Sequence, residues 1–264
     1  MLVTGAAGGI GGAIAAAFAR LGDRITGVDL RRDELARALA AVSEAHGVPT
    51  AALAGDLAEA SAAAALLDQV WDEHGPVDVL VNAAGIYPAN PLLGVTAEVW
   101  DRVQDVNVRA PMLTTVGFAR RAVELGRAGC VVNITSGAAL RARPGAAHYC
   151  ASKAALEMLT RAAAIELGPH RIRVNAVSPG FVEVVSPVNP VTETYAAAVA
   201  VNPLGRRGRP DDIASAVVWL ASDAASWVTG SILRVDGGAS AGAPSLPLHW
   251  NGLTPIQQGQ PVES

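Results

Sequence analysis

The sequence predicts an α/β protein with a single doubly wound domain, in which helices flank a parallel sheet of seven strands. Short apolar, β-branched runs alternate with alanine-rich stretches of helical period along most of the chain. Of the 264 residues, 51% are hydrophobic, which is enough to form a sizeable core. Buried strands that alternate with helices favour a parallel sheet with right-handed crossovers.

Each expected strand is a short run rich in small or β-branched apolar residues. The candidates are Met1–Val3, Arg24–Asp29, Thr50–Ala54, Val77–Asn82, Cys130–Ile134, Arg171–Val177 and Ser231–Val235. Ile14, Phe18 and Leu21 recur at i, i+4 and i+7, so a helix is expected after the first strand. Asp33 and Glu34 supply the acidic first turn of the next helix.

Two segments depart from this alternation. Residues 183–202 are rich in proline, valine and alanine, and an insertion there could form a lid over a site. Residues 241–264 contain four prolines and no helical period, so they form either an extended tail or a segment that packs on another subunit. We therefore expect a catalytic domain over residues 1–240, followed by this tail.

Composition excludes several function classes. The net charge is −4 and the pI is near 5.7, without the basic footprint that nucleic acids require. Arg206, Arg207 and Arg209 are interpreted as a solvated turn. No apolar run is long enough to span a membrane. Cys130 and Cys150 are the only cysteines, which favours the reducing cytoplasm.

A glycine-rich turn follows the first strand and opens the first helix, in the string Thr4-Gly5-Ala6-Ala7-Gly8-Gly9-Ile10-Gly11. Glycines permit a tight turn and close backbone approach, and a helix N-terminus offers free N–H groups to a pyrophosphate. The spacing differs from Gly-x-Gly-x-x-Gly, but the flanking strand and helix supply the context of a dinucleotide site.

Asp29 ends the second strand, where a carboxylate accepts hydrogen bonds from adenosine ribose hydroxyls and repels a 2′-phosphate. It therefore favours NAD over NADP. The alternative is a simple solvent-facing residue at a strand end. Arg31 and Arg32 weaken the NAD preference slightly, whereas Gly8 supports it because no basic side chain occupies the turn.

Two more strand ends carry candidate cofactor contacts. Asp56 could contact the adenine amino group, cap the helix that begins near Glu59, or do both. The segment Asn82-Ala83-Ala84-Gly85 closes the fourth strand, where loops hold cofactors. Asn82 could instead only tie the central strands together.

Lys153 is the only lysine among 20 basic residues, so position 153 is expected to need a compact ammonium rather than a planar guanidinium. Tyr149 lies four residues earlier and shares its helix face. A nearby cation favours the phenolate and lowers the pKa of a tyrosine, so this pair predicts an acid–base catalyst. The alternative is a half-buried tyrosine beside a lysine that extends to solvent.

Together these motifs resemble the short-chain dehydrogenase/reductases, which are NAD(P)-dependent oxidoreductases with a single Rossmann-type domain. The resemblance runs from Leu2 to about Gly238. It rests on the glycine turn, Asp56, Asn82-Ala83-Ala84-Gly85, Asn107, Ser136, Tyr149 with Lys153, Asn175, Pro179-Gly180 and Val235-Asp236-Gly237-Gly238.

The resemblance implies a role for each of four catalytic residues. Tyr149 is the implied general acid/base, Lys153 lowers its pKa and holds the nicotinamide ribose, and Ser136 binds the substrate oxygen. Asn107 would shape a helix and position a water in a proton relay. The implied cofactor contacts are Gly5, Gly8, Gly9, Ile10, Gly11, Asp29, Leu30, Asp56, Leu57, Asn82, Ala83, Ala84, Gly85, Tyr149, Lys153, Pro179, Gly180 and Val182.

The sequence departs from the family pattern at three places. Only three residues precede Thr4, the segment from Pro179 to Val184 has valine where many relatives carry a threonine, and Gly8 replaces a serine or similar residue. The short start puts the first strand's stability in doubt, and the missing hydroxyl could loosen cofactor binding.

The expected function is an NAD-dependent dehydrogenase that interconverts a secondary alcohol and a ketone, with no metal. The rivals are an NADPH-dependent carbonyl reductase and a dinucleotide-sensing module without turnover. A homotetramer or homodimer is implied by the family. The expected pocket walls, mostly apolar, favour a fairly hydrophobic alcohol; they are Tyr87, Ala138, Leu140, Arg141, Arg143, His148 and parts of Glu183–Tyr195. Arg141 or Arg143 could bind a carboxylate or could be a surface arginine.

Overall fold

A parallel sheet runs through the described part of the chain, which comprises residues 1–184, 191–243, 246 and 252 of this computed structural model. Its seven strands follow the order β3-β2-β1-β4-β5-β6-β7. All seven expected strands are present, with ends within two residues of the prediction. Their bounds are β1 Leu2–Thr4, β2 Ile25–Asp29, β3 Thr50–Ala54, β4 Val79–Asn82, β5 Gly129–Ile134, β6 Ile172–Pro179 and β7 Ile232–Val235.

The direction of winding reverses at β1, which pairs with β2 on one side and with β4 on the other. Thr4 at the end of β1 is level with Val28 and with Asn82. Ligands of open parallel sheets bind outside the carboxyl ends of strands at such a reversal. The topology therefore brings the glycine turn after β1 and the loop after β4 to one crevice.

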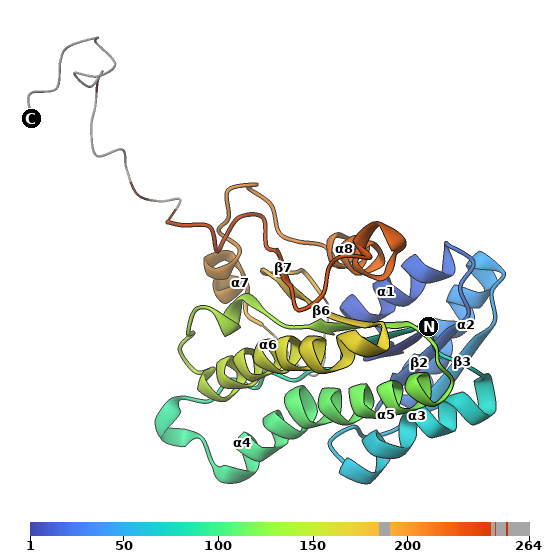
Figure 1. Ribbon diagram of the computed structural model, residues 1–264. Helices are drawn as coiled ribbons and strands as arrows, with labels where there is room; N and C mark the ends of the chain where they lie inside the picture. Colours follow the sequence, from blue (N-terminus) through green and yellow to red (C-terminus); the bar gives the residue numbers. More distant parts are fainter. Residues whose placement is uncertain (185–190, 244–245, 247–251, 253–264) are drawn as a thin grey trace, which may run out of the picture.

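Helices cover both faces of the sheet, with α1, α2 and α8 on one side and α3, α5 and α6 on the other (Figure 1). Each layer has its own buried cluster. On the second face, the rings of Trp71 and Phe118 pack with centroids 6.1 Å apart. The helices are α1 Gly9–Ala19, α2 Arg32–His46, α3 Ala60–His74, α4 Ala97–Gln104, α5 Ala110–Glu124, α6 Ala147–Leu167, α7 Glu193–Val199 and α8 Pro210–Ala221.

The first helices follow the sequence prediction with one exception. Asp33 and Glu34 lie in the first turn of α2, as expected. Leu21 was expected on α1, but it lies beyond the last residue, Ala19, and its side chain is 65% exposed. Gly22 adopts a positive φ of 88° there and turns the chain out of the helix.

Residues 183–202 contain α7, whose N-cap is Thr192; its hydroxyl accepts a hydrogen bond from the Tyr195 N–H at 3.2 Å. Residues 185–190 of the expected lid, and most of the expected tail over 241–264, lie outside the described residues. Within the described part, no helix is long and apolar enough to cross a membrane.

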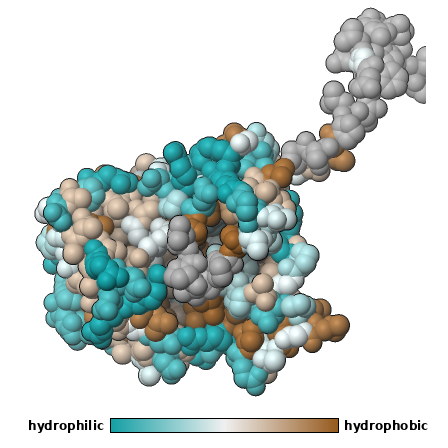
Figure 2. Space-filling view, turned by 180° about the vertical axis from the view of Figure 1, so that it is seen from behind, coloured by the Kyte–Doolittle hydropathy of each residue, from teal (hydrophilic) through white to brown (hydrophobic). Residues whose placement is uncertain are grey.

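The surface carries both charged pairs and exposed apolar side chains. In the expected arginine turn, Arg206 pairs with Asp212, and Arg207 pairs with Glu183 and Glu193. These exposed ion pairs confirm the interpretation of a solvated turn. Hydrophobic side chains gather toward one corner of the face seen in Figure 2, although most of that face is mixed.

Candidate functional site

The glycine turn between β1 and α1 is built on close backbone contacts. Gly5 has a positive φ of 72°, and a Cβ there would lie 3.0 Å from the backbone of Ala84. A Cβ on Gly11 would lie 2.2 Å from the Gly5 carbonyl oxygen, closer than two atoms can approach. Only glycine therefore fits at position 11. A Cβ on Gly8 would meet no atom within 4 Å, so that side of the turn is open.

Thr4 joins this turn to the loop after β4. Its Oγ1 accepts hydrogen bonds from the Ala83 N–H at 3.0 Å and from the Ala84 N–H at 3.1 Å. The sequence motifs assign no role to Thr4. Its position directly before Gly5, at the end of the strand where the winding reverses, was the available signal.

Asp29 lies at the end of β2 and is held in place from two sides. Its Oδ2 accepts the Ala7 N–H at 3.1 Å, and its Oδ1 accepts the Arg31 N–H at 3.0 Å and Arg31 Nε at 3.2 Å. The side chain is 9% exposed. The carboxylate is thus fixed beside the glycine turn, and the nearby Arg31 is engaged with it.

Asp56 does not cap a helix, which was one of its two possible roles, because the N-cap of α3 is Glu59. Its Oδ1 instead accepts the Ala58 N–H at 2.9 Å, and its Oδ2 pairs with Arg102 at 2.9 Å. The side chain of Leu57 is buried in the core cluster on the second face of the sheet, so only its backbone remains for a cofactor. Leu30, by contrast, is 62% exposed.

Asn82 ties the central elements together, which was one of its two expected roles. Its Nδ2 donates to Asn133 Oδ1 at 2.9 Å, and its Oδ1 accepts from Thr114 Oγ1 at 2.8 Å. Asn133 in turn donates to Thr160 Oγ1 at 2.9 Å. This buried chain links β4, β5, α5 and α6, and satisfaction of each polar group gives it a defined geometry.

Tyr149 and Lys153 lie one turn apart near the start of α6. Lys153 Nζ is 5.8 Å from the centroid of the Tyr149 ring. The lysine is 4% exposed, and its Nζ donates to the Ile134 carbonyl oxygen at 2.9 Å. The side chain is therefore buried rather than extended to solvent, which rules out the alternative reading of the pair. A Cβ on Gly85 would lie 3.4 Å from Nζ.

The pKa of Tyr149 moves opposite to the sequence expectation. Burial raises it to about 12, while a hydrogen bond from the Ser136 side chain and the charge of Arg143 act in the lowering direction. Burial also lowers the pKa of Lys153 to about 8. Both shifts favour uncharged forms, because removal from water penalises charge on either group. For Tyr149, the Ser136 hydrogen bond and the charge of Arg143 do not overcome this burial.

Ser136 follows β5 and is 7% exposed. Its Oγ accepts the Ala138 N–H at 3.1 Å, which opens a short 3-10 turn. The Ser136 side chain also lies close enough to the Tyr149 hydroxyl to act on its pKa, in the lowering direction. The strand end and the helix thus converge on one pair of hydroxyl groups.

Asn107 lies in a π-helical turn, η2 (Asp105–Arg109), between α4 and α5. Its carboxamide accepts the Ile86 N–H and donates to the Ile86 carbonyl oxygen, both at 2.9 Å. It also donates to Ser152 Oγ at 3.0 Å, and Ser152 donates to the Tyr149 carbonyl oxygen at 2.8 Å. Asn107 therefore connects the loop after β4 to the helix that carries Tyr149 and Lys153.

The residues expected to line a substrate pocket lie in different surroundings. The rings of Tyr87 and Tyr149 pack with centroids 5.5 Å apart. His148 does not line a pocket: it is fully buried, and its Nε2 lies 2.9 Å from the Pro88 carbonyl oxygen. Ala138 is also buried. His148 faces inward because it precedes Tyr149 and so projects from a different side of the helix.

The segment after β6 packs against the glycine turn and the last strand. A Cβ on Gly180 would lie 2.8 Å from the Asp236 Cα, so glycine permits close approach there. Pro179 belongs to β6, and Val182 forms an isolated bridge with Gly208. Val184 lies 3.7 Å from the position of a Cβ on Gly9, which places this segment against the glycine turn. No group of three or more His, Cys, Asp or Glu in the described residues could hold a metal ion.

Comparison with known proteins agrees with this arrangement. A family model described as enoyl-(acyl carrier protein) reductase matches residues 5–240. D-erythrulose reductase of Gallus gallus is 38% identical over 239 residues, which is 90% of this chain and 94% of the relative.

Two solved structures superpose on most of the chain. A short-chain type dehydrogenase/reductase from Mycobacterium marinum is 34% identical, with a TM-score of 0.83 over 91% of this chain and 94% of that one. 4-Hydroxyisoleucine dehydrogenase complexed with NADH is 33% identical, with a TM-score of 0.80 over 92% of this chain and 98% of that one.

Proposed function

Because the chain belongs to the short-chain dehydrogenase/reductase family, we propose that it interconverts a secondary alcohol and a ketone, with Tyr149 as the general acid/base. The chain is an NAD(P)-dependent oxidoreductase. The observation that supports this particular chemistry is the convergence of Tyr149, Lys153 and the Ser136 hydroxyl at the carboxyl ends of the strands.

The crevice fits a nicotinamide dinucleotide. Gly8 faces open space, and the N-terminus of α1 offers N–H groups that have no partner within the helix. We propose that Gly5, Gly9, Ile10 and Gly11 bind the pyrophosphate. The backbone from Asn82 to Gly85 and the segment Pro179–Val182 line the remaining length, with Lys153 available to the nicotinamide ribose.

NAD is the proposed cofactor rather than NADP. Asp29 is fixed beside the glycine turn, where its carboxylate would accept ribose hydroxyls and repel a 2′-phosphate. Arg31 is already paired with Asp29, so it is not free to meet a phosphate. Tighter binding of NADPH than of NADH in a fluorescence titration would contradict this choice, and would favour the rival carbonyl reductase.

In the proposed mechanism, Tyr149 and Ser136 act on the substrate oxygen, and Lys153 and Asn107 position them. The bound cofactor supplies or accepts the hydride. The Tyr149 hydroxyl gives its proton to a ketone oxygen, or its phenolate takes the proton from an alcohol. The Ser136 hydroxyl donates to the same substrate oxygen and steadies its developing charge. Lys153, which is linked to the Ile134 carbonyl, and Asn107, which holds Ile86, keep this group of side chains in place.

The direct test is Tyr149→Phe, assayed by absorbance at 340 nm with a panel of secondary alcohols and ketones. Phenylalanine keeps the ring but removes the transferable proton, so turnover should fall by about 10²–10⁴-fold while NADH binding is retained. A variant as active as the wild type would contradict the proposal. A wild type that binds NADH but turns over nothing in the panel would favour the dinucleotide-sensing module.

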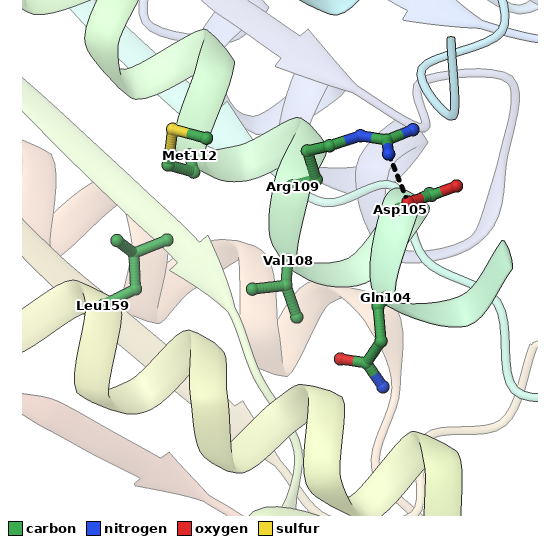
Figure 3. Close-up of a pocket in the computed structure, with 6 residues that line it drawn as sticks. All are labelled: Gln104, Asp105, Val108, Arg109, Met112 and Leu159. Atoms are coloured by element: carbon green, nitrogen blue, oxygen red, sulfur yellow. Dashed lines mark ion pairs between the residues drawn. The ribbon is translucent and has the colours of Figure 1, made fainter. Parts of the chain in front are cut away.

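We also propose that the protein is a homotetramer or homodimer. A groove between α5 and α6 is lined largely by apolar side chains, among them Val116, Ala119, Val123 and Ala163. A smaller hollow continues it, with Met112 and Leu159 at one end and the Arg109–Asp105 ion pair at the other (Figure 3). An apolar face of this kind on two adjacent helices suits a second copy of the same pair.

We also propose the extent of the catalytic domain and its cellular compartment. The catalytic domain spans residues 1–240, and residues 241–264 form a tail. The protein acts in the cytoplasm, where its two cysteines stay reduced. In support, Cys130 is a free, buried thiol and burial raises its pKa to about 11.

A further inference from the structure

A single arginine, Arg143, interacts with all three tyrosines of this chain: it is hydrogen-bonded to Tyr195, and its charge acts on Tyr87 and Tyr149. Arg143 Nη1 donates to the Tyr195 hydroxyl at 3.4 Å. The positive charge of Arg143 acts in the lowering direction on the pKa of both Tyr87 and Tyr149. The guanidinium therefore lies near the proposed acid/base, although it comes from the loop before α6.

Arg143 has no acidic partner among the described residues. The acids of the neighbouring segment, Glu183 and Glu193, are both paired with Arg207. The charge of Arg143 is thus left uncompensated in a half-buried place. An arginine fork is the group best suited to bind a carboxylate in two parallel hydrogen bonds.

The loop that carries Arg143 is held in place. The Asn90 N–H donates to the Gly145 carbonyl at 2.9 Å, and the Ala146 N–H donates to the Arg143 carbonyl at 3.2 Å. Residues 86–90, which contact this loop through Asn90, are held as well. The Ile86 N–H donates to Asn107, and the Pro88 carbonyl group is hydrogen-bonded to His148. Because these hydrogen bonds hold the Arg143 loop and the segment next to it, the guanidinium is preorganised for binding. An arginine on a mobile surface loop would not be.

We propose that Arg143, with the hydroxyl of Tyr195, binds a carboxylate of the substrate beside Tyr149, so that the substrate is a hydroxy or keto acid rather than a neutral alcohol. This inference rests on the proposed alcohol–ketone activity and narrows its substrate class. Arg143 selects the substrate, and the proton chemistry remains with Tyr149.

The test measures binding separately from turnover. Straight-chain carboxylates of four to eight carbons, and the amides of equal length, are titrated into the wild-type NADH complex, with cofactor fluorescence as the readout. At the best chain length the carboxylate should bind at least about tenfold more tightly than its amide, the effect of a charge-assisted contact. Arg143→Gln should abolish this preference, and Arg143→Lys should restore part of it.

Arg141→Gln is the matched control, because Arg141 is an exposed arginine two residues away on the same loop. It should keep the preference for carboxylates. Equal binding of acids and amides by the wild type, an unchanged preference in Arg143→Gln, or an equal loss in Arg141→Gln would each overturn the proposal.

Turnover then separates the two proposals. Hydroxy acids should be oxidised at least about tenfold more efficiently, in kcat/KM, than their amides, and only Arg143→Gln should remove this difference. Equal turnover of acids and amides would overturn the carboxylate site and leave the alcohol–ketone activity standing. Arginine-dependent carboxylate binding with no turnover of any hydroxy acid would support the site but contradict the proposed activity.

Discussion

Lys153 occupies a place suited to an ammonium group and closed to a guanidinium. Its Nζ donates to the Ile134 carbonyl at 2.9 Å and lies near Gly85, while Asn107 closes a neighbouring side of the same space. The side chain is 4% exposed. This explains why a chain that otherwise uses arginine for its basic residues keeps lysine here: the wider planar group would overpack a buried site.

Lys153→Arg is expected to be less stable than the wild type by about 1–3 kcal/mol, because extra atoms enter a packed site. Turnover should be lost as well. Lys153→Met keeps a long unbranched side chain without charge, so it should be inactive but at least as stable at pH 7. Urea unfolding and the 340 nm assay measure both effects. An active, stable Lys153→Arg variant would contradict the need for a compact charge.

The buried ammonium also predicts how stability depends on pH. The pKa of Lys153 is lowered to about 8 in the folded protein, so above this pH the unfolded chain binds more protons than the folded one. The free energy of unfolding should therefore rise between pH 8 and pH 10, by about 2 kcal/mol from this residue. Tyr149, whose pKa is raised to about 12, opposes this only above pH 10.

Urea titrations at pH 8 and pH 10 test this, with Lys153→Met as the reference. The variant lacks the titrating group, so its stability should change by about 2 kcal/mol less over the same interval. Parallel pH profiles for the two proteins would show that Lys153 is protonated to the same extent when folded and unfolded.

At the scale of elements, short contacts between backbones set the geometry of the site. The glycine turn fits against the loop after β4 because Gly5 and Gly11 carry no Cβ, and Thr4 links the two segments by hydrogen bonds. The π-helical turn at Asn107 places one carboxamide against both polar groups of Ile86. Such irregular turns are frequent at functional sites, where they aim a side chain that a regular helix would not.

The substitutions Gly11→Ala and Gly8→Ala lie in one turn, but the added methyl group has room only at position 8. A Cβ at position 11 would sit 2.2 Å from the Gly5 carbonyl oxygen, whereas one at position 8 would touch nothing within 4 Å. Gly11→Ala should lower the free energy of unfolding by at least about 2 kcal/mol through forced backbone movement. Gly8→Ala should stay within about 0.5 kcal/mol of the wild type.

Thermal and urea unfolding without cofactor measure these differences directly, since they do not depend on binding. If both variants lost similar amounts of unfolding free energy, steric crowding at Gly11 would not be the cause.

At the scale of the whole molecule, both helical layers expose apolar side chains, but only one of them carries the apolar groove. The layer of α5 and α6 carries the apolar groove, flanked by exposed side chains such as Met158 at 62% and Ile165 at 79%. On the opposite side of the sheet, Trp219 next to the end of α8 is 42% exposed and Trp227 is fully exposed. Exposed apolar side chains of this kind are what an assembly of identical subunits would cover.

Val116→Arg introduces a charge at the groove and should shift the oligomer toward smaller species. The arginine would be desolvated without a partner in the interface, which weakens association by several kcal/mol. Leu21→Arg is the control, since Leu21 is exposed beyond the end of α1. Light scattering coupled to size-exclusion chromatography should show one mass for the wild type and the control, and a lower mass for Val116→Arg. If the wild type, Leu21→Arg and Val116→Arg all had the same mass, the subunit interface would not include this groove.

The sequence alone predicted the seven strands, the parallel sheet and the identity of the residues at the strand ends, because hydrophobic periodicity and glycine spacing are local properties. It also singled out Lys153 from residue usage. Two local expectations were wrong, the helical position of Leu21 and the cap at Asp56, since both depend on where a helix begins or ends, which sequence patterns define least well.

Tertiary structure decided what depends on residues far apart in the chain. The pKa of Tyr149 is raised rather than lowered because burial by distant segments outweighs the opposing effects of the Ser136 hydrogen bond and the Arg143 charge. His148 is buried against the Pro88 carbonyl group, and Arg143 contacts Tyr195 from 52 residues away. Motifs specify which groups are present, but their dielectric surroundings and partners exist only once the chain has folded, because solvent exclusion is a property of the packed molecule.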